Sequence, residues 1–215
     1  GTSNLKGTVR DWESPKYDLE ISSTVDLTRT SEIFPLGTPL RGFGNFNGKV
    51  TGEGEKYRID GEITSEAISA SNIYLKALNV DAALDGKGSA YDLNGRAIAE
   101  LLTFEDFEID FPQLIGNIRG TGTDFKWVGE LQAAAVRSPL GTIGGLYITD
   151  AVADYKDERF DATLGSVRAG TFFTEDADIE NLRAGNVKVA VVGDDVNVTA
   201  PNVTAGKVDA EGATL

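Results

Sequence analysis

The sequence predicts an all-β protein, a long antiparallel sheet of repeated hairpin units curled into a trough or β-roll. Three observations predict it. A glycine-marked pattern recurs at a fixed interval of 34 residues, each copy continues into alternating apolar and polar residues, and helix signals are nearly absent. Alternation with a period of two is typical of a strand that buries one face.

The repeat is clearest in three segments that align without a gap on the pattern G-x-G-x-x-[YF]-x-[ILW]-x-G. These copies start at Gly52, Gly86 and Gly120, two steps of 34 residues. Weaker copies surround Tyr17, Phe160 and Val196. We therefore expect a single elongated domain over residues 1–215, with units starting near residues 5, 48, 85, 118, 150 and 186 and two or three strands in each. The chain begins Gly-Thr-Ser without Met, which predicts a piece of a longer protein.

The paired glycines resemble a phosphate-binding loop, but such a loop requires a helix directly after it. Here Tyr57, Ile59 and Ile63 alternate with charged residues, which indicates a strand. The glycines are therefore predicted to form tight reversals between strands, where a positive φ is needed. A further glycine at the tenth position of each copy marks an expected bend: Gly61, Gly95 and Gly129.

Return strands are expected before each reversal, and one of them places Tyr147, Thr149, Ala151 and Ala153 on a single face. A third short stretch lies between the two strands of a unit, as at 68–75 and 107–115.

One face of such a sheet is apolar and has to be covered. The sheet can close, fold over itself or bind something apolar, and the residues of this face are then either an ordinary core or the lining of a lipid path. We assign ten residues to it: Tyr57, Ile59, Ile63, Tyr91, Leu93, Phe125, Trp127, Leu131, Phe160 and Leu164.

Composition excludes several classes of function. The chain has no Cys, His or Met, which removes disulfides, thiolate and imidazole metal ligands and His-dependent triads. The net charge of −14 disfavours nucleic acid and anionic membrane surfaces. The acidic clusters at 105–110, 175–178 and 194–195 match no calcium-binding motif and are expected to be solvated turns. We expect no catalytic residue, no metal, no cofactor and no enzymatic activity.

The reiterated strand turn, together with the phrase ISASNIYLKALNV from Ile68 to Val80 and related phrases at Val167 and Val203, resembles the AsmA-like superfamily, the TamB- and YdbH-type periplasmic β-groove proteins. The resemblance covers about residues 40 to 215. It implies a periplasmic segment, anchored elsewhere in the bacterial envelope, that is involved in phospholipid transport between the inner and outer membranes or in outer-membrane assembly. Phospholipid acyl chains would then be its partners.

An alternative is a structural or adhesive surface β-solenoid with a self-filled core and no ligand. The two functions differ in whether the inner aromatic residues interdigitate across two walls or face an open space.

Overall fold

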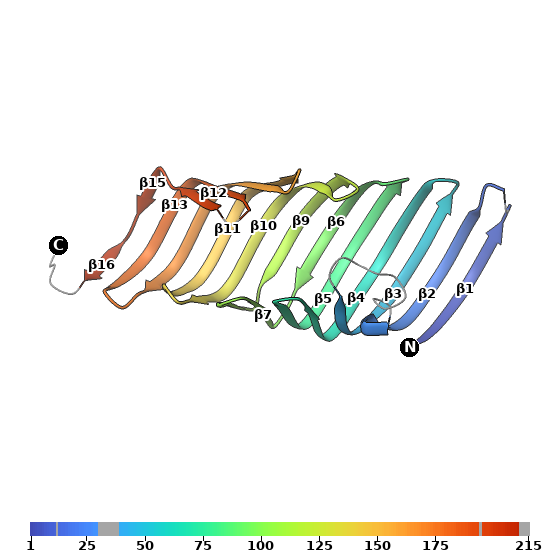
Figure 1. Cartoon of the computed structure of the whole chain (residues 1–215), viewed down its shortest axis with the longest axis horizontal. Coiled ribbons are helices and arrows are strands. Elements are labelled where there is room, and N and C mark those ends of the chain that lie inside the picture. The colour runs from blue at the N-terminus through green and yellow to red at the C-terminus, as the bar shows by residue number, and fades with distance from the viewer. Residues whose placement is uncertain (12, 30–38, 194, 211–215) are drawn as a thin grey trace.

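The computed structural model describes residues 1–11, 13–29, 39–193 and 195–210, and it consists almost entirely of strands (Figure 1). The predicted fold class is confirmed, because the strands form a single antiparallel sheet. The strands are β1 (Thr2–Arg10), β2 (Lys16–Asp26), β3 (Leu40–Glu53), β4 (Lys56–Ala70), β5 (Ile73–Lys87), β6 (Ala90–Ile98), β7 (Leu101–Phe104), β8 (Phe107–Asp110), β9 (Gln113–Thr121), β10 (Asp124–Ser138), β11 (Gly141–Lys156), β12 (Arg159–Phe173), β13 (Ala177–Val192), β14 (Asp195–Thr199), β15 (Asn202–Thr204) and β16 (Lys207–Ala210).

The sheet is a meander, in which strands follow one another in space in the order of the sequence. Its path runs β1-β2-β3-β4-β5-β6-β9-β10-β11-β12-β13-β14. The short strands β7 and β8 pair with each other and fill the space between β5 and β10, below β6 and β9. At about 4.8 Å between neighbouring strands, this path is about 53 Å long.

The 34-residue period corresponds to one hairpin. Each of its two strands, together with the turn that follows it, takes up 17 residues. If β6 with β7, and β8 with β9, are each counted as one interrupted strand, six consecutive strands keep this step, beginning at residues 56, 73, 90, 107, 124 and 141. The expected third stretch at 68–75 is not a separate element, because it comprises the end of β4, a turn and the start of β5.

The glycines of the repeat form reversals, as predicted. Gly54, Gly88 and Gly122 open two-residue loops with φ between 56° and 61°, the conformation that the first position of a type II′ turn requires. The turns are also bonded to one another, because Gly88 N donates to Glu55 O and Gly122 N donates to Ser89 O, both at 3.1 Å. The glycine turns thus form one continuous rim of the sheet.

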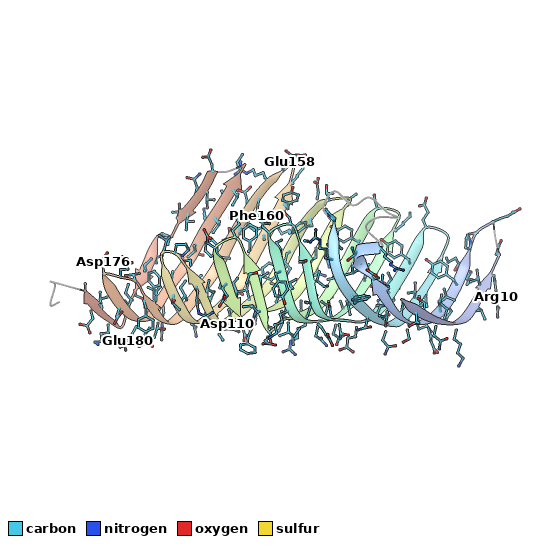
Figure 2. All side chains as sticks on the ribbon, turned by 60° about the horizontal axis from the view of Figure 1, so that its bottom comes forward. Arg10, Asp110, Glu158, Phe160, Asp176 and Glu180 are labelled. Carbon is cyan, nitrogen blue, oxygen red and sulfur yellow. The ribbon has the colours of Figure 1, made fainter. Side chains whose placement is uncertain are left out.

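A line of irregular backbone crosses the strands about ten residues from this rim. Ala77, Phe111, Gly145 and Asn181 lie on it with φ between 48° and 63°. At the same line the ladder is interrupted, since β6 ends at Ile98 and β7 begins at Leu101. A residue in the left-handed region interrupts the extended backbone, and the strands curve along their length so that the sheet is a trough (Figure 2).

The bend line divides each strand into two parts. We call the part between the glycine turns and the bend line the long arm, and the part beyond the line the short arm. On β4 the long arm is 56–65, about 34 Å, and the short arm is 67–70, about 13 Å.

Two expectations about the strands were wrong. Gly61 and Gly95 lie within continuous ladders and do not mark the bend, and only at Gly129 does a register shift follow. Tyr147 does not share a face with Ala151, because Asp150 adopts a positive φ of 53° and the register with β10 slips there. Tyr147 therefore lies beside Gln132 on the polar face, where its hydroxyl donates to a Glu130 carboxylate oxygen at 3.0 Å.

The sheet is a single layer, and its accessible surface shows this directly. A compact 22.9 kDa protein exposes about 9,600 Å², whereas the described residues together expose 13,941 Å². No large side chain among them is fully buried. The buried apolar residues all lie on the apolar face of the sheet: Ala99, Ala133, Ile148, Ala151, Ala153, Ala169 and Val187.

Candidate functional site

The strand register aligns the apolar side chains in rows that run along the trough. The row nearest the glycine rim, which we call the aromatic row, alternates rings with glycines across the N-terminal half of the sheet. Tyr57 lies between Gly52 and Gly86, and Tyr91 lies between Gly86 and Gly120. The complete set of rings in this row is Tyr17, Tyr57, Tyr91, Phe125, Tyr155 and Phe160.

The glycines of the aromatic row leave the space that the rings occupy. A Cβ atom on Gly86 would lie 2.1 Å from Cζ of Tyr57, and one on Gly120 would lie 2.4 Å from the Tyr91 hydroxyl oxygen. Each ring therefore lies across the backbone of the next strand, and a larger residue there would displace it. Where the glycines stop, the rings stack, with the centroids of Phe125 and Tyr155 5.6 Å apart.

Three further rows cover the rest of the long arm. The second row is aliphatic except for Trp127, and the third consists mainly of glycine and alanine. The ten residues assigned from the sequence all lie on this one face: Tyr57, Tyr91, Phe125 and Phe160 in the aromatic row, Ile59, Leu93 and Trp127 in the second row, Leu164 in the third, and Ile63 and Leu131 in the fourth. None of the ten is fully buried, and Ile63 is 42% exposed.

The sequence analysis missed an apolar row on the short arm. It passes without a break through nine strand segments: Ile68, Leu75, Leu102, Ile109, Val136, Ile143, Phe172, Ile179 and Val208. Ala133 and Val136 are separated by two residues, not one, and the left-handed Gly145 lies opposite this point on β11, so the alternation of side chains shifts by one residue at the bend. The 34-residue spacing of Ile68, Leu102 and Val136 is a signal that could have identified it.

No protein-family model, no curated protein and no solved structure matches this chain. The apolar rows and the polar face are therefore the basis for assigning a function. Among the described residues, no helix is long and apolar enough to cross a membrane.

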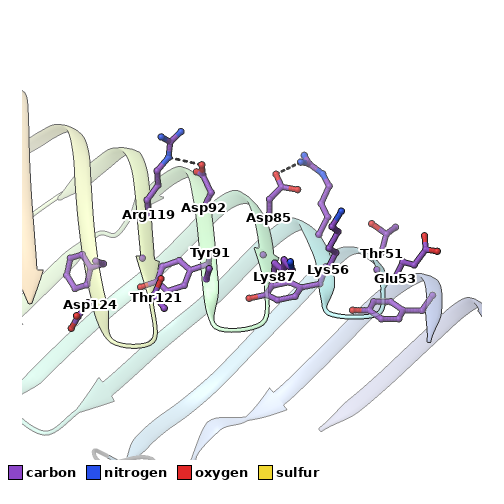
Figure 3. Close-up of a pocket in the computed structure, with 18 of the residues that line it drawn as sticks. Thr51, Glu53, Lys56, Asp85, Lys87, Tyr91, Asp92, Arg119, Thr121 and Asp124 are labelled. Carbon is purple, nitrogen blue, oxygen red and sulfur yellow. Dashed lines mark hydrogen bonds and ion pairs between the residues drawn. The ribbon is translucent and has the colours of Figure 1, made fainter. Parts of the chain in front are cut away.

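The opposite face of the sheet is charged, and its side chains form ion pairs between strands. Arg58 lies 2.7 Å from Asp60 and 2.6 Å from Asp85, and Arg119 lies 2.7 Å from Asp92 (Figure 3). All these groups are substantially exposed, so each pair contributes little to stability. Their main effect is to keep this face in water, which leaves the apolar face as the surface that can take an apolar ligand.

Hydrogen bonds lower the pKa values of two acidic side chains of the charged face. A hydrogen bond from Asn117 lowers the pKa of Asp92, and one from Arg159 lowers the pKa of Asp161. Within the described ranges, no three acidic side chains converge as a metal site would require. The acidic pair at 194–195 includes Asp194, which lies outside the described residues.

One ion-pair cluster holds the short strand β8 to β10. The Arg137 guanidinium contacts Glu108 at 2.5 Å and also bonds both carboxylate oxygens of Asp110, and this hydrogen bonding holds the pKa of Asp110 below its usual value. A carboxyl whose pKa is lowered by folding stabilises the protein above its unfolded pKa, near 3.9, and loses that contribution as pH falls through the folded pKa.

We therefore expect Arg137→Gln to lower the urea midpoint at pH 7 and to have less effect at pH 2, where the carboxylates are largely protonated. The control is Arg183→Gln, since the Arg183 guanidinium makes no ion pair with a described residue. An equal effect of the Arg137 substitution at both pH values would contradict the assignment.

Proposed function

We propose that this chain is a periplasmic segment of an AsmA-like bridge protein, and that its trough holds phospholipid acyl chains on their way between the inner and outer membranes or serves outer-membrane assembly. One observation carries the proposal. The apolar face runs the length of the sheet, the described residues place no second layer over it, and the accessible surface exceeds that of a compact protein by roughly 4,000 Å².

An uncovered apolar face of this kind indicates an apolar partner. Acyl chains fit it, because each methylene group that leaves water contributes about 0.8 kcal/mol. Long-arm and short-arm rows both run across the strands, so a chain that lies along the trough contacts the same kind of side chain at every step. The charged outer face stays hydrated, which supports a role in an aqueous compartment.

The structural alternative finds support in the C-terminal half. Ile148, Ala151 and Ala153 on β11 and Val187 on β13 are buried, so side chains of the sheet itself cover part of the apolar face there. In a structural protein with no ligand, such burial of the apolar face by the sheet's own side chains is expected along the whole sheet.

The proposal is tested by introducing a photo-crosslinking amino acid at single positions on both faces of β6 and β10. Leu93 and Trp127 lie on the apolar face, and their neighbours Asn94 and Lys126 lie on the charged face. After irradiation in envelope membranes, we expect mass spectrometry to find phospholipid adducts at Leu93 and Trp127 and none at Asn94 and Lys126. Adducts on both faces alike, or none on the apolar face, would contradict lipid binding in the trough.

A further inference from the structure

The two ends of the sheet are open strand edges. β1 forms one end, and β14 with β15 and β16 forms the other (Figure 1). Among the described residues, β1 pairs only with β2, and β14 pairs only with β13. Apolar side chains are exposed at both edges, Val9 at 42% on β1 and Val196 and Val198 at 63% on β14. Each edge therefore offers unpaired backbone groups and an apolar surface to a further strand.

The number of strands makes the two edges complementary in direction. The path from β1 to β14 contains twelve strands, each antiparallel to the next. The loop after β1 reaches the glycine rim, since Gly54 N donates to Pro15 O, so β1 runs toward the rim and β14 runs away from it. A second copy placed end to end, with the rims aligned, thus brings its β1 antiparallel to β14 of the first copy, with both apolar faces on the same side.

The aromatic row sets the register of this contact. Val9 lies opposite Tyr17 at one end of the row. At the other end the row continues from Phe160 through Val191 to Val196. Aligning the rows of two copies places Val9 of one beside Val196 of the other, and the positions on either side follow from this pair.

The backbone groups of both edges suit this register. The hydrogen bond from Gly54 N to Pro15 O, at 3.1 Å, fixes which residue pairs of β2 and β3 are hydrogen-bonded. Because such pairs alternate, Tyr17 directs its N–H and C=O to β3, and Val9 opposite it directs its own groups away from β2. The same alternation, followed from strand to strand along the row, leaves Val196 with its groups directed away from β13. Val9 and Val196 can therefore exchange both backbone hydrogen bonds.

The charges of the two edges are also complementary. β1 carries Lys6 and Arg10 and no carboxylate, whereas β14 carries Asp195 and no cation. Neither Arg10 nor Asp195 makes an ion pair with a described residue. In the shared register these two residues come to lie directly opposite each other on the charged face. Pairing of two copies through the same edge would instead bring like charges together, which is unfavourable.

We propose that copies of this chain associate end to end, β14 of one copy pairing with β1 of the next over residues 195–199 and 6–10. The glycine rim and the apolar face then pass from one copy to the next, whatever the trough binds. Pro201, which has no N–H, ends the contact on the β14 side. The association is weak, because it consists of one short strand pair between molecules of net charge −14.

Disulfide trapping tests the register, since the chain has no cysteine of its own. Position 8 falls opposite position 197 in a non-hydrogen-bonded pair, whose Cα atoms are about 4.5 Å apart and within reach of a disulfide. Thr8→Cys protein is mixed with Asn197→Cys protein, one of them tagged, in a glutathione redox buffer. The matched control replaces Asn197→Cys by Val198→Cys, whose side chain lies on the other face of the same strand. We expect about fivefold more disulfide-linked heterodimer from the first mixture than from the control.

Charge reversal tests the ion pair in the same assay. Adding Arg10→Asp to the Thr8→Cys protein should lower the heterodimer yield about fivefold, and adding Asp195→Arg to the Asn197→Cys protein should restore it. Circular dichroism of the reduced proteins checks that every variant is folded. Equal yields with Asn197→Cys and Val198→Cys, no heterodimer at all, or a Thr8→Cys homodimer as the main product would each overturn the end-to-end contact.

Discussion

Replacing Leu93 with glutamate is expected to abolish lipid capture while the sheet stays folded. Leu93 pairs with Leu84 on one side and Ile118 on the other, in the middle of the second apolar row. An acyl chain along this row would have to desolvate the new carboxylate, which costs several kcal/mol when no partner is present. No cation lies in the row to provide one.

Folding should tolerate the same substitution, because Leu93 is only half-buried and the carboxylate of a glutamate there can stay hydrated. We expect a loss of about 1–2 kcal/mol in the free energy of unfolding, the part of the leucine burial that is given up. Asn94→Glu, one residue away on the charged face, is the matched control and should leave both lipid binding and stability close to those of the wild type. Binding is measured by lipid retention in native mass spectrometry and folding by circular dichroism. Global unfolding of the Leu93 variant would indicate a sealed core instead.

Gly86→Ala is expected to destabilise the protein by about 2 kcal/mol, a typical cost of overpacking. The three atoms nearest to the added Cβ all belong to the Tyr57 ring, at 2.1 to 2.4 Å. The methyl group would therefore push the ring off the neighbouring backbone and break the aromatic row at that strand.

A double-mutant cycle isolates this effect. In the Tyr57→Ala background the ring is gone, and Gly86→Ala should then be neutral, so that the coupling energy is about 2 kcal/mol. Urea unfolding of the four proteins measures it. Gly185→Ala is the control for backbone effects, because Gly185 also lies in a strand without a positive φ and its Cβ would meet only Gly165 O, at 3.8 Å. If Gly86→Ala lowers the free energy of unfolding equally with and without the Tyr57 ring, Tyr57 does not lie on Gly86 as described.

The face of each site residue could be read from the sequence because the turns fix the register. Two-residue loops opened by Gly54, Gly88 and Gly122 allow no slip, so residues at equal positions in the repeat must meet across the sheet. For that reason Tyr57, Tyr91 and Phe125, which occupy equal positions of the repeat, lie in one row. Their partners were not foreseen, since the glycines that receive the rings were assigned only to turns.

The bend could not be predicted, because its residues do not favour the conformation they adopt. Ala77 and Phe111 have φ values of 52° and 48°, in a region that side chains normally avoid. The paired strands on either side impose this conformation, which is a tertiary effect without a local sequence signal. Since the bend shifts the alternation by one residue, the apolar row beyond it was out of phase with the pattern and was overlooked.

The constant 17-residue step has a consequence for the size of the molecule. One added hairpin of 34 residues inserts two strands and lengthens the trough by about 10 Å, and it leaves the rim, the rows and the bend in phase. An odd number of residues inserted within a strand would instead move the following side chains of that strand to the other face and interrupt the rows there. Related troughs of different reach can therefore arise by duplication of whole units, with their internal surface unchanged from one end to the other.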